Sequence, residues 1–157
     1  MHLLFVCTGN TCRSPLAVAA LRAELGEDAK EVEISSAGTG ATPGSPASEG
    51  SRQVATASGF DLSGHRSRQV IREVVQAADL VFVMSPSQRA TLEALGAAPG
   101  QVHVVSEWPE PGEPELPVFD PFGASREAYE ECWQRLRRHA RRIAPHVKQA
   151  LRERRIP

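Results

Sequence analysis

Short, uninterrupted runs of apolar residues constrain the fold of this chain more than any other feature. Residues 3–6, 80–84 and, more weakly, 102–105 form such runs. Runs of this length are typical of strands buried on both faces, as in a parallel sheet with helices on either side. Residues 31–35 alternate between polar and apolar side chains instead, which predicts an edge strand.

The segments between these runs have the start and stop signals of helices. A serine can cap a first helical turn, and a proline fits the first helical position because it has no N–H to satisfy. The pair occurs at Ser14-Pro15, Ser45-Pro46 and Ser85-Pro86, and the glycines that would end these helices are Gly26, Gly59 and Gly96. Further helices are predicted over residues 67–77 and 125–151, the second with a kink at Pro145.

Strands and helices therefore alternate along the chain, in the order β-α-β-α-α-β-α-β-loop-α. This order predicts an α/β fold whose parallel strands are joined by right-handed crossovers. A length of 157 residues, without repeats or a low-complexity linker, suits a single domain over residues 1–157. Ligands of such folds bind beyond the carboxyl ends of the strands, and the first predicted strand ends at Cys7.

Composition narrows the function classes. No apolar run approaches the roughly 20 residues that span a bilayer, and the first residues lack the basic leader of a secretory signal. We therefore expect a cytoplasmic protein with no membrane partner. Three cysteines do not form a paired disulfide framework. Their spacing contains no C-x-x-C and no histidine cluster lies near them, so we expect no bound metal.

Charge is distributed unevenly along the chain. Residues 124–157 contain ten Lys or Arg against four Asp or Glu, whereas residues 1–123 contain eight against fifteen. A basic helix can bind nucleic acid, but this segment lacks a pattern of interleaved aromatics and its arginines fall on several sides of a helix. We expect a solvated face, or a helix that docks against the acidic body, and no nucleic-acid partner.

The segment from Cys7 to Ser14 has the features of an oxyanion-binding loop. Its backbone N–H groups and the start of the following helix can converge on one anion. Gly9 permits backbone angles closed to other residues, and Asn10 tolerates a left-handed conformation. Arg13 can hold two phosphate oxygens with its fork, and the positive surroundings favour a thiolate. The sequence therefore predicts that Cys7 attacks phosphorus to form a phosphocysteine, with Ser14 steadying the sulfur as it leaves.

The alternative is a buried cysteine at a strand end beside an unrelated surface arginine, because C-x5-R alone is a weak signal. Here the motif follows the first apolar run and precedes a predicted helix start, which is the context of a phosphate-binding loop. The residues expected to surround the phosphate are Thr8, Gly9, Asn10, Thr11, Cys12, Arg13 and Ser14.

The sequence from Val6 to Pro15 resembles the signature of the low-molecular-weight protein tyrosine phosphatase family. The similarity extends to residues 35–38, 65–69, 78–80 and 120–123, and so covers nearly the whole chain. The resemblance implies a three-layer α/β/α fold with a four-stranded parallel sheet in the order 2-1-3-4. It also implies a two-step phosphatase mechanism without a metal or other cofactor, acting on a phosphorylated protein or peptide.

The resemblance also implies roles for residues outside the loop. Asp120, which follows a proline-rich segment over residues 108–117, would be the general acid that protonates the leaving group and then activates water. Without the resemblance, Asp120 could equally be an ordinary turn residue, since Asp-Pro is a common turn signal. His65 and Ser36 would brace the loop residue Asn10.

The two remaining cysteines have different expected uses. Cys12 matches a second cysteine of the family loop, and is either a small loop residue or the partner of Cys7 in a reversible disulfide that prevents over-oxidation. We favour the second, and peroxide inactivation that thiols cannot reverse would contradict it. Cys132 lies in the last predicted helix, where we expect a small apolar residue.

Two positions bear on the substrate. Tyrosine-specific members of the resembled family usually have a bulky aliphatic residue where this loop has Thr11, and two aromatics after Asp-Pro where this chain has Phe122 and Gly123. Thr11 with Asp-Pro-Phe-Gly resembles the bacterial protein arginine phosphatase branch, and a threonine hydroxyl can hydrogen-bond a phosphoguanidinium. We therefore prefer phosphoarginine to phosphotyrosine. A second carboxylate near the mouth would help to hold the guanidinium, but the sequence does not identify it.

Two other functions stay open. Arsenate reduction on this fold needs a relay of thiols, and residues 70–100 contain no cysteine, which argues against it. A non-catalytic phosphate-binding module would need neither a thiol nor an acid. The combination of Cys7, Arg13 and Asp120 therefore favours an enzyme.

Overall fold

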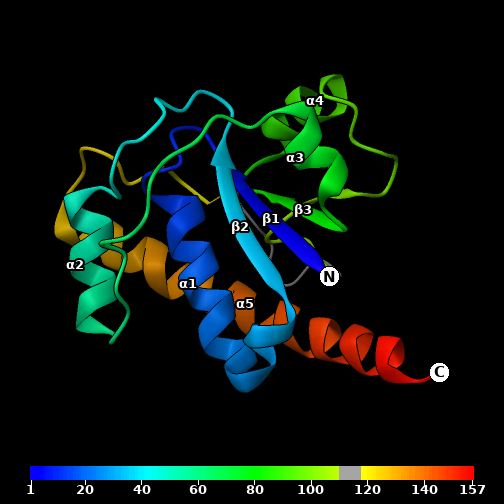
Figure 1. Ribbon diagram of the computed structural model, residues 1–157. Coiled ribbons are helices and arrows are strands. Elements are labelled where there is room, and N and C mark those ends of the chain that lie inside the picture. The colour runs from blue at the N-terminus through cyan, green and yellow to red at the C-terminus, as the bar shows by residue number, and fades with distance from the viewer. Residues whose placement is uncertain (110–117) are drawn as a thin grey trace.

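The computed structural model describes residues 1–109 and 118–157. Within these ranges, four strands form one parallel sheet in the order β2-β1-β3-β4 (Figure 1). The strands are β1 (His2–Cys7), β2 (Glu33–Gly38), β3 (Leu80–Val83) and β4 (Val102–Val104). The predicted α/β fold and its strand order are confirmed. Most of the proline-rich segment predicted before Asp120 lies outside the described residues.

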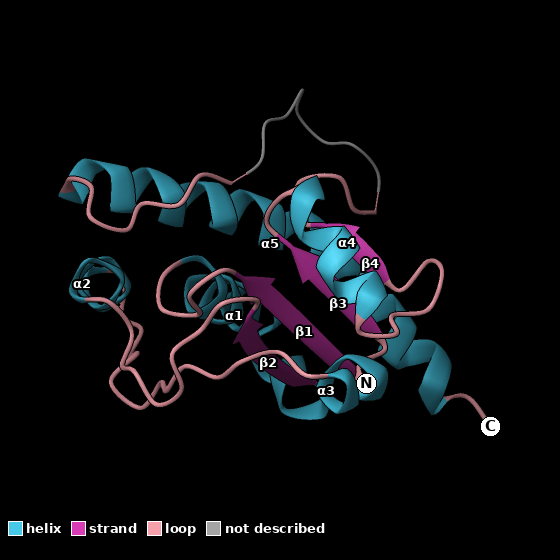
Figure 2. Cartoon of the chain, turned by 90° about the horizontal axis from the view of Figure 1, so that it is seen from above, coloured by secondary structure: helices cyan, strands magenta, loops and turns pink. Residues whose placement is uncertain are grey.

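Helices cover both faces of the sheet and give three layers (Figure 2). On one face lie α1 (Arg13–Leu25) and α5 (Arg126–Arg155), with α2 (Glu49–Ala57) packed against them; on the other lie α3 (Arg72–Ala77) and α4 (Pro86–Ala94). The side chains of β1 alternate between the two cores, with Leu3 and Phe5 in the first and Leu4 and Val6 in the second. Because both faces are covered, the strand reads as a continuous apolar run.

Helix ends follow the predicted glycines. α1, α2 and α4 end within two residues of a glycine with positive φ, at Gly26 (59°), Gly59 (86°) and Gly96 (90°). Glycine adopts such a φ at little cost, and the chain can then turn away from the helix while the last helical carbonyls still accept hydrogen bonds. A short 3-10 helix, η1 (Gly26–Glu31), then joins α1 to β2.

Helix starts follow the predicted Ser-Pro pairs in only one of three cases. α4 begins at Pro86 as predicted, although the side chain of Ser85 contacts Ser87 Oγ rather than a backbone N–H. The prediction for α1 is wrong, because the helix begins one residue before Ser14. The prediction for α2 is also wrong: the cap is Ser48, whose Oγ accepts from Ser51 N.

The helix predicted over residues 67–77 is wrong in its first half. α3 begins only at Arg72, and the preceding residues extend along the end of β2, where Gly38 N donates to Arg68 O (2.9 Å) and Val70 N donates to Gly38 O (2.8 Å). The spacing of apolar residues fits a helix. The backbone of this segment instead forms hydrogen bonds with the backbone at the edge of β2, which would otherwise be unpaired. β2 itself is an edge strand as predicted, beginning two residues later than expected.

The last helix, α5, begins after Ser125, whose Oγ accepts from Ala128 N (3.3 Å). Pro145 lies inside α5, which continues to Arg155, so the proline does not end the helix; the predicted kink stays a prediction. Trp133 and Ile143 on its apolar face are fully buried. None of the helices in the described part of the chain has the length and apolar character needed to cross a membrane.

The basic residues of α5 pair with the acidic body, one of the two arrangements expected. Arg154 lies 3.1 Å from Asp79, and Arg137 and Arg141 lie 3.3 and 3.4 Å from Glu24. The charge asymmetry along the sequence is therefore partly neutralised within the fold.

Candidate active site

The predicted loop begins where the central strand β1 ends, at the carboxyl edge of the sheet. Cys7 is the last residue of β1 and is 2% exposed. Its register partner is Gly38 at the end of β2, and Thr39 N and Gly40 N donate to the carbonyl oxygens of Cys7 and Thr8. A Cβ on Gly38 would lie 2.4 Å from Thr8 O, so only glycine allows the loop to pass this close.

Asn10 holds the loop in its curved conformation. It has φ 57°, the left-handed region that favours Gly and Asn, and is fully buried. Its Nδ2 donates to Ser14 Oγ (2.8 Å) and Ser36 Oγ (2.9 Å), and its Oδ1 accepts from Arg68 N (2.9 Å). The structure therefore brings Ser36 and Asn10 into direct contact.

His65 contacts the same residue through the backbone. Its Nε2 lies 2.6 Å from Asn10 O, and because a carbonyl only accepts, Nε2 donates. Burial lowers the pKa of His65 below its ordinary value of 6.5, so the ring is neutral at pH 7. Four side-chain or backbone groups from three segments thus surround Asn10.

Ser14 connects this network to the sulfur of Cys7. Its Oγ lies 3.0 Å from Cys7 Sγ and accepts a hydrogen bond from Asn10 Nδ2. Because the amide nitrogen Nδ2 can only donate, the hydroxyl hydrogen of Ser14 is free to point at the sulfur. This arrangement suits a thiolate.

Arg13 is buried beside Cys7 with part of its guanidinium unused. Its Nη1 donates to Val118 O (3.0 Å) and its Nη2 to Thr8 Oγ1 (3.4 Å). Its buried Nε has no hydrogen-bond partner among the described residues. A buried N–H without a partner is costly, so an oxyanion that accepted from it would be bound favourably.

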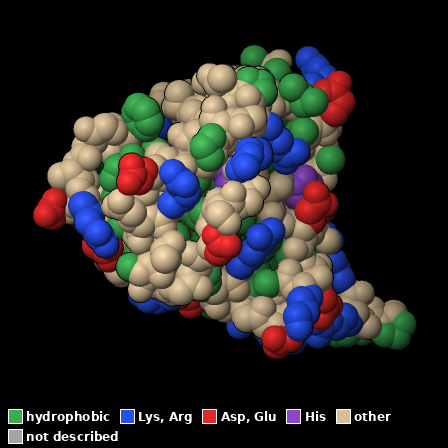
Figure 3. All heavy atoms as spheres, turned by 60° about the vertical axis from the view of Figure 1, so that its left-hand side comes forward, with side chains coloured by type: hydrophobic (Ala, Val, Ile, Leu, Met, Phe, Trp, Pro, Cys, Tyr) green, Lys and Arg blue, Asp and Glu red, His purple; other side chains and the backbone are tan. Residues whose placement is uncertain are grey.

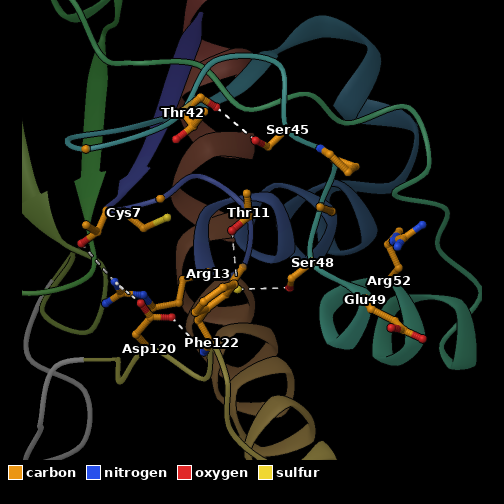
Figure 4. A pocket seen from close by; sticks show the side chains of 16 residues that line it. Cys7, Thr11, Arg13, Thr42, Ser45, Ser48, Glu49, Arg52, Asp120 and Phe122 are labelled. Atoms are coloured by element: carbon orange, nitrogen blue, oxygen red, sulfur yellow. Dashed lines mark hydrogen bonds and ion pairs between the residues drawn. The ribbon is translucent and has the colours of Figure 1, made fainter.

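Asp120 approaches the same guanidinium from the loop before α5. Its Oδ2 lies 3.6 Å from Arg13 Nη2, its Oδ1 accepts from Phe122 N (3.1 Å), and its side chain is about half exposed. A carboxylate at this position can exchange a proton with a group bound at Arg13. Asp120 is 113 residues from Cys7 in the sequence, and the fold brings both of them to one cavity with Arg13 (Figure 4).

Gln88, in the first turn of α4, contacts the loop residue Thr8 and was not identified from the sequence. It is 8% exposed; its Oε1 accepts from Met84 N (2.8 Å) and its Nε2 donates to Thr8 Oγ1 (3.3 Å), which also accepts from Arg13. Its position just beyond a buried strand, at the edge of the sheet where the loop lies, was the available signal.

A cavity of about 500 Å³ is lined by Cys7, Arg13 and Asp120 together with Thr11 and Phe122. Figure 4 shows α2 contributing Glu49 and Arg52 at the side of the cavity away from Cys7. Neither residue was identified from the sequence. Glu49 is the second carboxylate that lines the cavity, in addition to Asp120.

The side chain of Cys12, within the loop, contacts hydroxyl groups. It is 4% exposed, and its Sγ is 3.1 Å from Ser48 Oγ and 3.6 Å from the hydroxyl of Tyr129. All three cysteines are free thiols here. A disulfide between Cys7 and Cys12 stays a prediction.

Cys132 is buried in α5, as expected of a small apolar residue. Burial raises the pKa of its thiol to about 12, so the group is protonated at neutral pH. In the described ranges, no group of three or more His, Cys, Asp or Glu side chains is placed to hold a metal ion.

Known proteins similar to this chain are phosphatases. The family described as "Low molecular weight phosphotyrosine protein phosphatase" matches residues 2–154. A probable low molecular weight protein-tyrosine-phosphatase, EpsP of Ralstonia nicotianae, is 33% identical over 93% of this chain and 95% of its own. The protein-arginine-phosphatase of Bacillus subtilis is 30% identical over 94% of this chain and 97% of its own.

The fold is also found in a solved structure of the arginine phosphatase YwlE. That protein is a cysteine-to-serine mutant with a phosphorylated active-site serine. It is 29% identical to this chain, with a TM-score of 0.86 over 94% of this chain and 96% of its own.

Proposed function

The chain belongs to the low molecular weight phosphotyrosine protein phosphatase family, and we propose that it hydrolyses phosphoarginine on proteins, with Cys7 as the nucleophile, Arg13 as the phosphate clamp and Asp120 as the general acid and base. The chain is a protein phosphatase. The roles of the individual residues and the preference for phosphoarginine are our proposal, and the contacts described above support them.

The observation that carries the proposal is the buried Arg13, whose Nε has no partner among the described residues, in one cavity with Cys7 and Asp120. A phosphoryl group at Arg13 accepts from this N–H and lies against the sulfur of Cys7. The carboxyl group of Asp120 lines the same cavity. The phosphoryl group is then surrounded by a nucleophile, a clamp and an acid.

The reaction has two steps. In the first, the thiolate of Cys7 attacks phosphorus; the S–P bond forms, the P–N bond to the arginine breaks, and Asp120 gives its proton to the leaving nitrogen. In the second, water attacks phosphorus while Asp120 takes one of its protons. The S–P bond breaks and inorganic phosphate leaves. The hydroxyl of Ser14, 3.0 Å from the sulfur, stabilises the thiolate that departs.

The preference for phosphoarginine rests on the walls of the cavity. Thr11 offers a hydroxyl, and Phe122 is an exposed aromatic on the loop of Asp120. A guanidinium is planar and cationic, so the carboxylate of Glu49 in the same cavity favours a guanidinium over a phenyl ring. The similarity to the arginine phosphatase of Bacillus subtilis supports the same choice.

The test is kcat/KM on matched peptides that carry phosphoarginine or phosphotyrosine at the same position. We expect the phosphoarginine peptide to be preferred, and Thr11→Ile to shift the ratio toward phosphotyrosine. Thr42→Ile is the control, because Thr42 lines the same cavity outside the phosphate loop. An unchanged ratio in Thr11→Ile would show that Thr11 does not set the preference.

Phosphotyrosine is the second candidate substrate. The similarity to EpsP, a probable tyrosine phosphatase, favours it, and the exposed Phe122 could stack on a phenyl ring. A wild-type ratio that favours the phosphotyrosine peptide would select this function. Loss of activity on both peptides in Cys7→Ser is expected in either case.

A further inference from the structure

A second cavity adjoins the candidate active site on the surface of α2. It has a volume of about 540 Å³ and is lined by Glu49, Arg52, Gln53, Thr56 and Arg126. Glu49 and Arg52 also line the cavity of Cys7. The two cavities therefore meet at these two side chains. We call the second cavity, which extends along the exposed face of α2 to the first turn of α5, the α2 groove.

The helix that forms the α2 groove is packed against the core. Val54 and Ala55 on the inner face of α2 are fully buried, whereas Glu49, Arg52 and Thr56 are exposed. A Cβ on Gly50 would lie 2.5 Å from the ring of Tyr129, so α2 packs directly against α5 at this point. This packing fixes the side of the groove that carries Arg52 relative to the side that carries Arg126.

The two arginines of the groove have no partners of their own. The guanidinium groups of Arg52 and Arg126 make no hydrogen bond or ion pair with a described residue, in contrast to those of Arg137 and Arg154 in α5. Glu49 Oε1 accepts from Gln53 Nε2 (3.2 Å) rather than pairing with Arg52. On the face that Figure 3 brings forward, basic and acidic side chains are interspersed.

A protein substrate whose phosphorylated side chain enters the cavity of Cys7 can place its neighbouring residues in this groove, because the groove adjoins that cavity. Guanidinium groups bind carboxylates with charge-assisted, paired hydrogen bonds. We propose that the α2 groove binds the substrate segment next to the phosphorylated residue, and that Arg52 and Arg126 select acidic side chains in it. The inference rests on the proposed function, since it requires a protein substrate at Cys7.

The test compares phosphorylated peptides that differ only in one flanking position, Asp or Ala, at each of the three residues before and after the phosphorylated one. We expect Asp on one side to raise kcat/KM by about two- to fivefold, as one exposed ion pair would. This preference should fall to near one in the double variant Arg52→Gln/Arg126→Gln. It should also weaken as salt concentration rises.

Two controls separate the possible outcomes. Arg138→Gln removes an exposed arginine of α5 that lines neither cavity, and should leave the peptide preference unchanged. Hydrolysis of p-nitrophenyl phosphate, which has no flanking residues, should be unaffected in Arg138→Gln. In Arg52→Gln/Arg126→Gln the ratio of the Asp to the Ala peptide is taken within the variant, because Arg52 also lines the cavity of Cys7 and its loss can change the basal rate. Acidic preference that is absent, or that survives in the double variant, or that falls equally in Arg138→Gln, would overturn the inference. If the wild-type protein did not hydrolyse p-nitrophenyl phosphate, that result would instead contradict the proposed function.

Discussion

At the scale of single residues, the half-exposed carboxylate of Asp120 meets two kinds of partner in the proposed reaction. Without phosphate it faces the Arg13 guanidinium at 3.6 Å, and with phosphate it faces an anion. In the proposed reaction, the carboxyl group of Asp120 gives a proton to the leaving group in the first step and takes one from water in the second.

Asp120→Asn keeps the shape of this side chain and removes the proton it can give. We expect kcat to fall by about two to three orders of magnitude, with little change in KM. The fall should be smaller for an aryl phosphate with a good leaving group, which needs less protonation. Steady-state kinetics on a series of aryl phosphates would measure this, and an equal fall across the series would contradict the acid role.

Asn10 combines backbone geometry with three side-chain hydrogen bonds, so its replacement should affect stability as well as activity. We expect Asn10→Ala to destabilise the fold by about 3 kcal/mol, because it strains a left-handed residue and leaves buried partners unpaired. Asn10→Gly removes the hydrogen bonds without the strain, and should cost about 1 kcal/mol less. Urea unfolding of both variants separates the two contributions; equal losses would show that strain plays no part.

At the scale of elements, the end of β2 sets the path of the phosphate loop. Gly38 leaves room for Thr8 O, which a Cβ would approach to 2.4 Å. We expect Gly38→Ala to displace the loop, to destabilise the fold by about 1–3 kcal/mol and to lower activity sharply.

The control is Gly64→Ala, since a Cβ at Gly64 meets nothing within 4 Å and its φ is not positive. Phosphatase assays and urea unfolding of the two variants test the prediction. Equal activity in Gly38→Ala and Gly64→Ala would show that the loop does not depend on this contact.

At the scale of the whole molecule, α5 carries a buried histidine whose charge the fold disfavours. His139 is 4% exposed, and burial, with the nearby Arg135, Arg142 and Arg138, lowers its pKa from 6.5 to about 4. Between these two values the unfolded chain binds a proton that the folded chain does not. Stability therefore falls as pH falls from 6.5 to 4, by up to about 3 kcal/mol.

Urea unfolding at pH 7 and pH 4.5 measures this dependence. In His139→Gln, which cannot ionise, the loss of stability between the two pH values should be smaller than in the wild-type protein. The control is His146→Gln, because His146 is an exposed histidine of the same helix. An equal loss in the wild-type protein and His139→Gln would contradict the prediction.

Much of the fold could be predicted because its signals are local. The strands β1, β3 and β4 are apolar runs in the sequence because both faces of the sheet are buried there, and α1, α2 and α4 end within two residues of glycines with positive φ. The errors arose where tertiary contacts compete with local preference. Residues 68–70 lie along the free edge of β2 rather than in a helix, and Ser14 turns toward Cys7 and Asn10 rather than capping α1.

By itself, the sequence determined the fold class and the residues that approach phosphate from one loop, because Cys7 and Arg13 are close along the chain. Only the tertiary structure decided what stands opposite that loop. Gln88, Glu49 and Arg52 come from α4 and α2, and no spacing in the sequence relates them to Cys7. Their positions depend on how separate helices pack around the carboxyl edge of the sheet, and that packing is set by contacts between residues far apart in the chain.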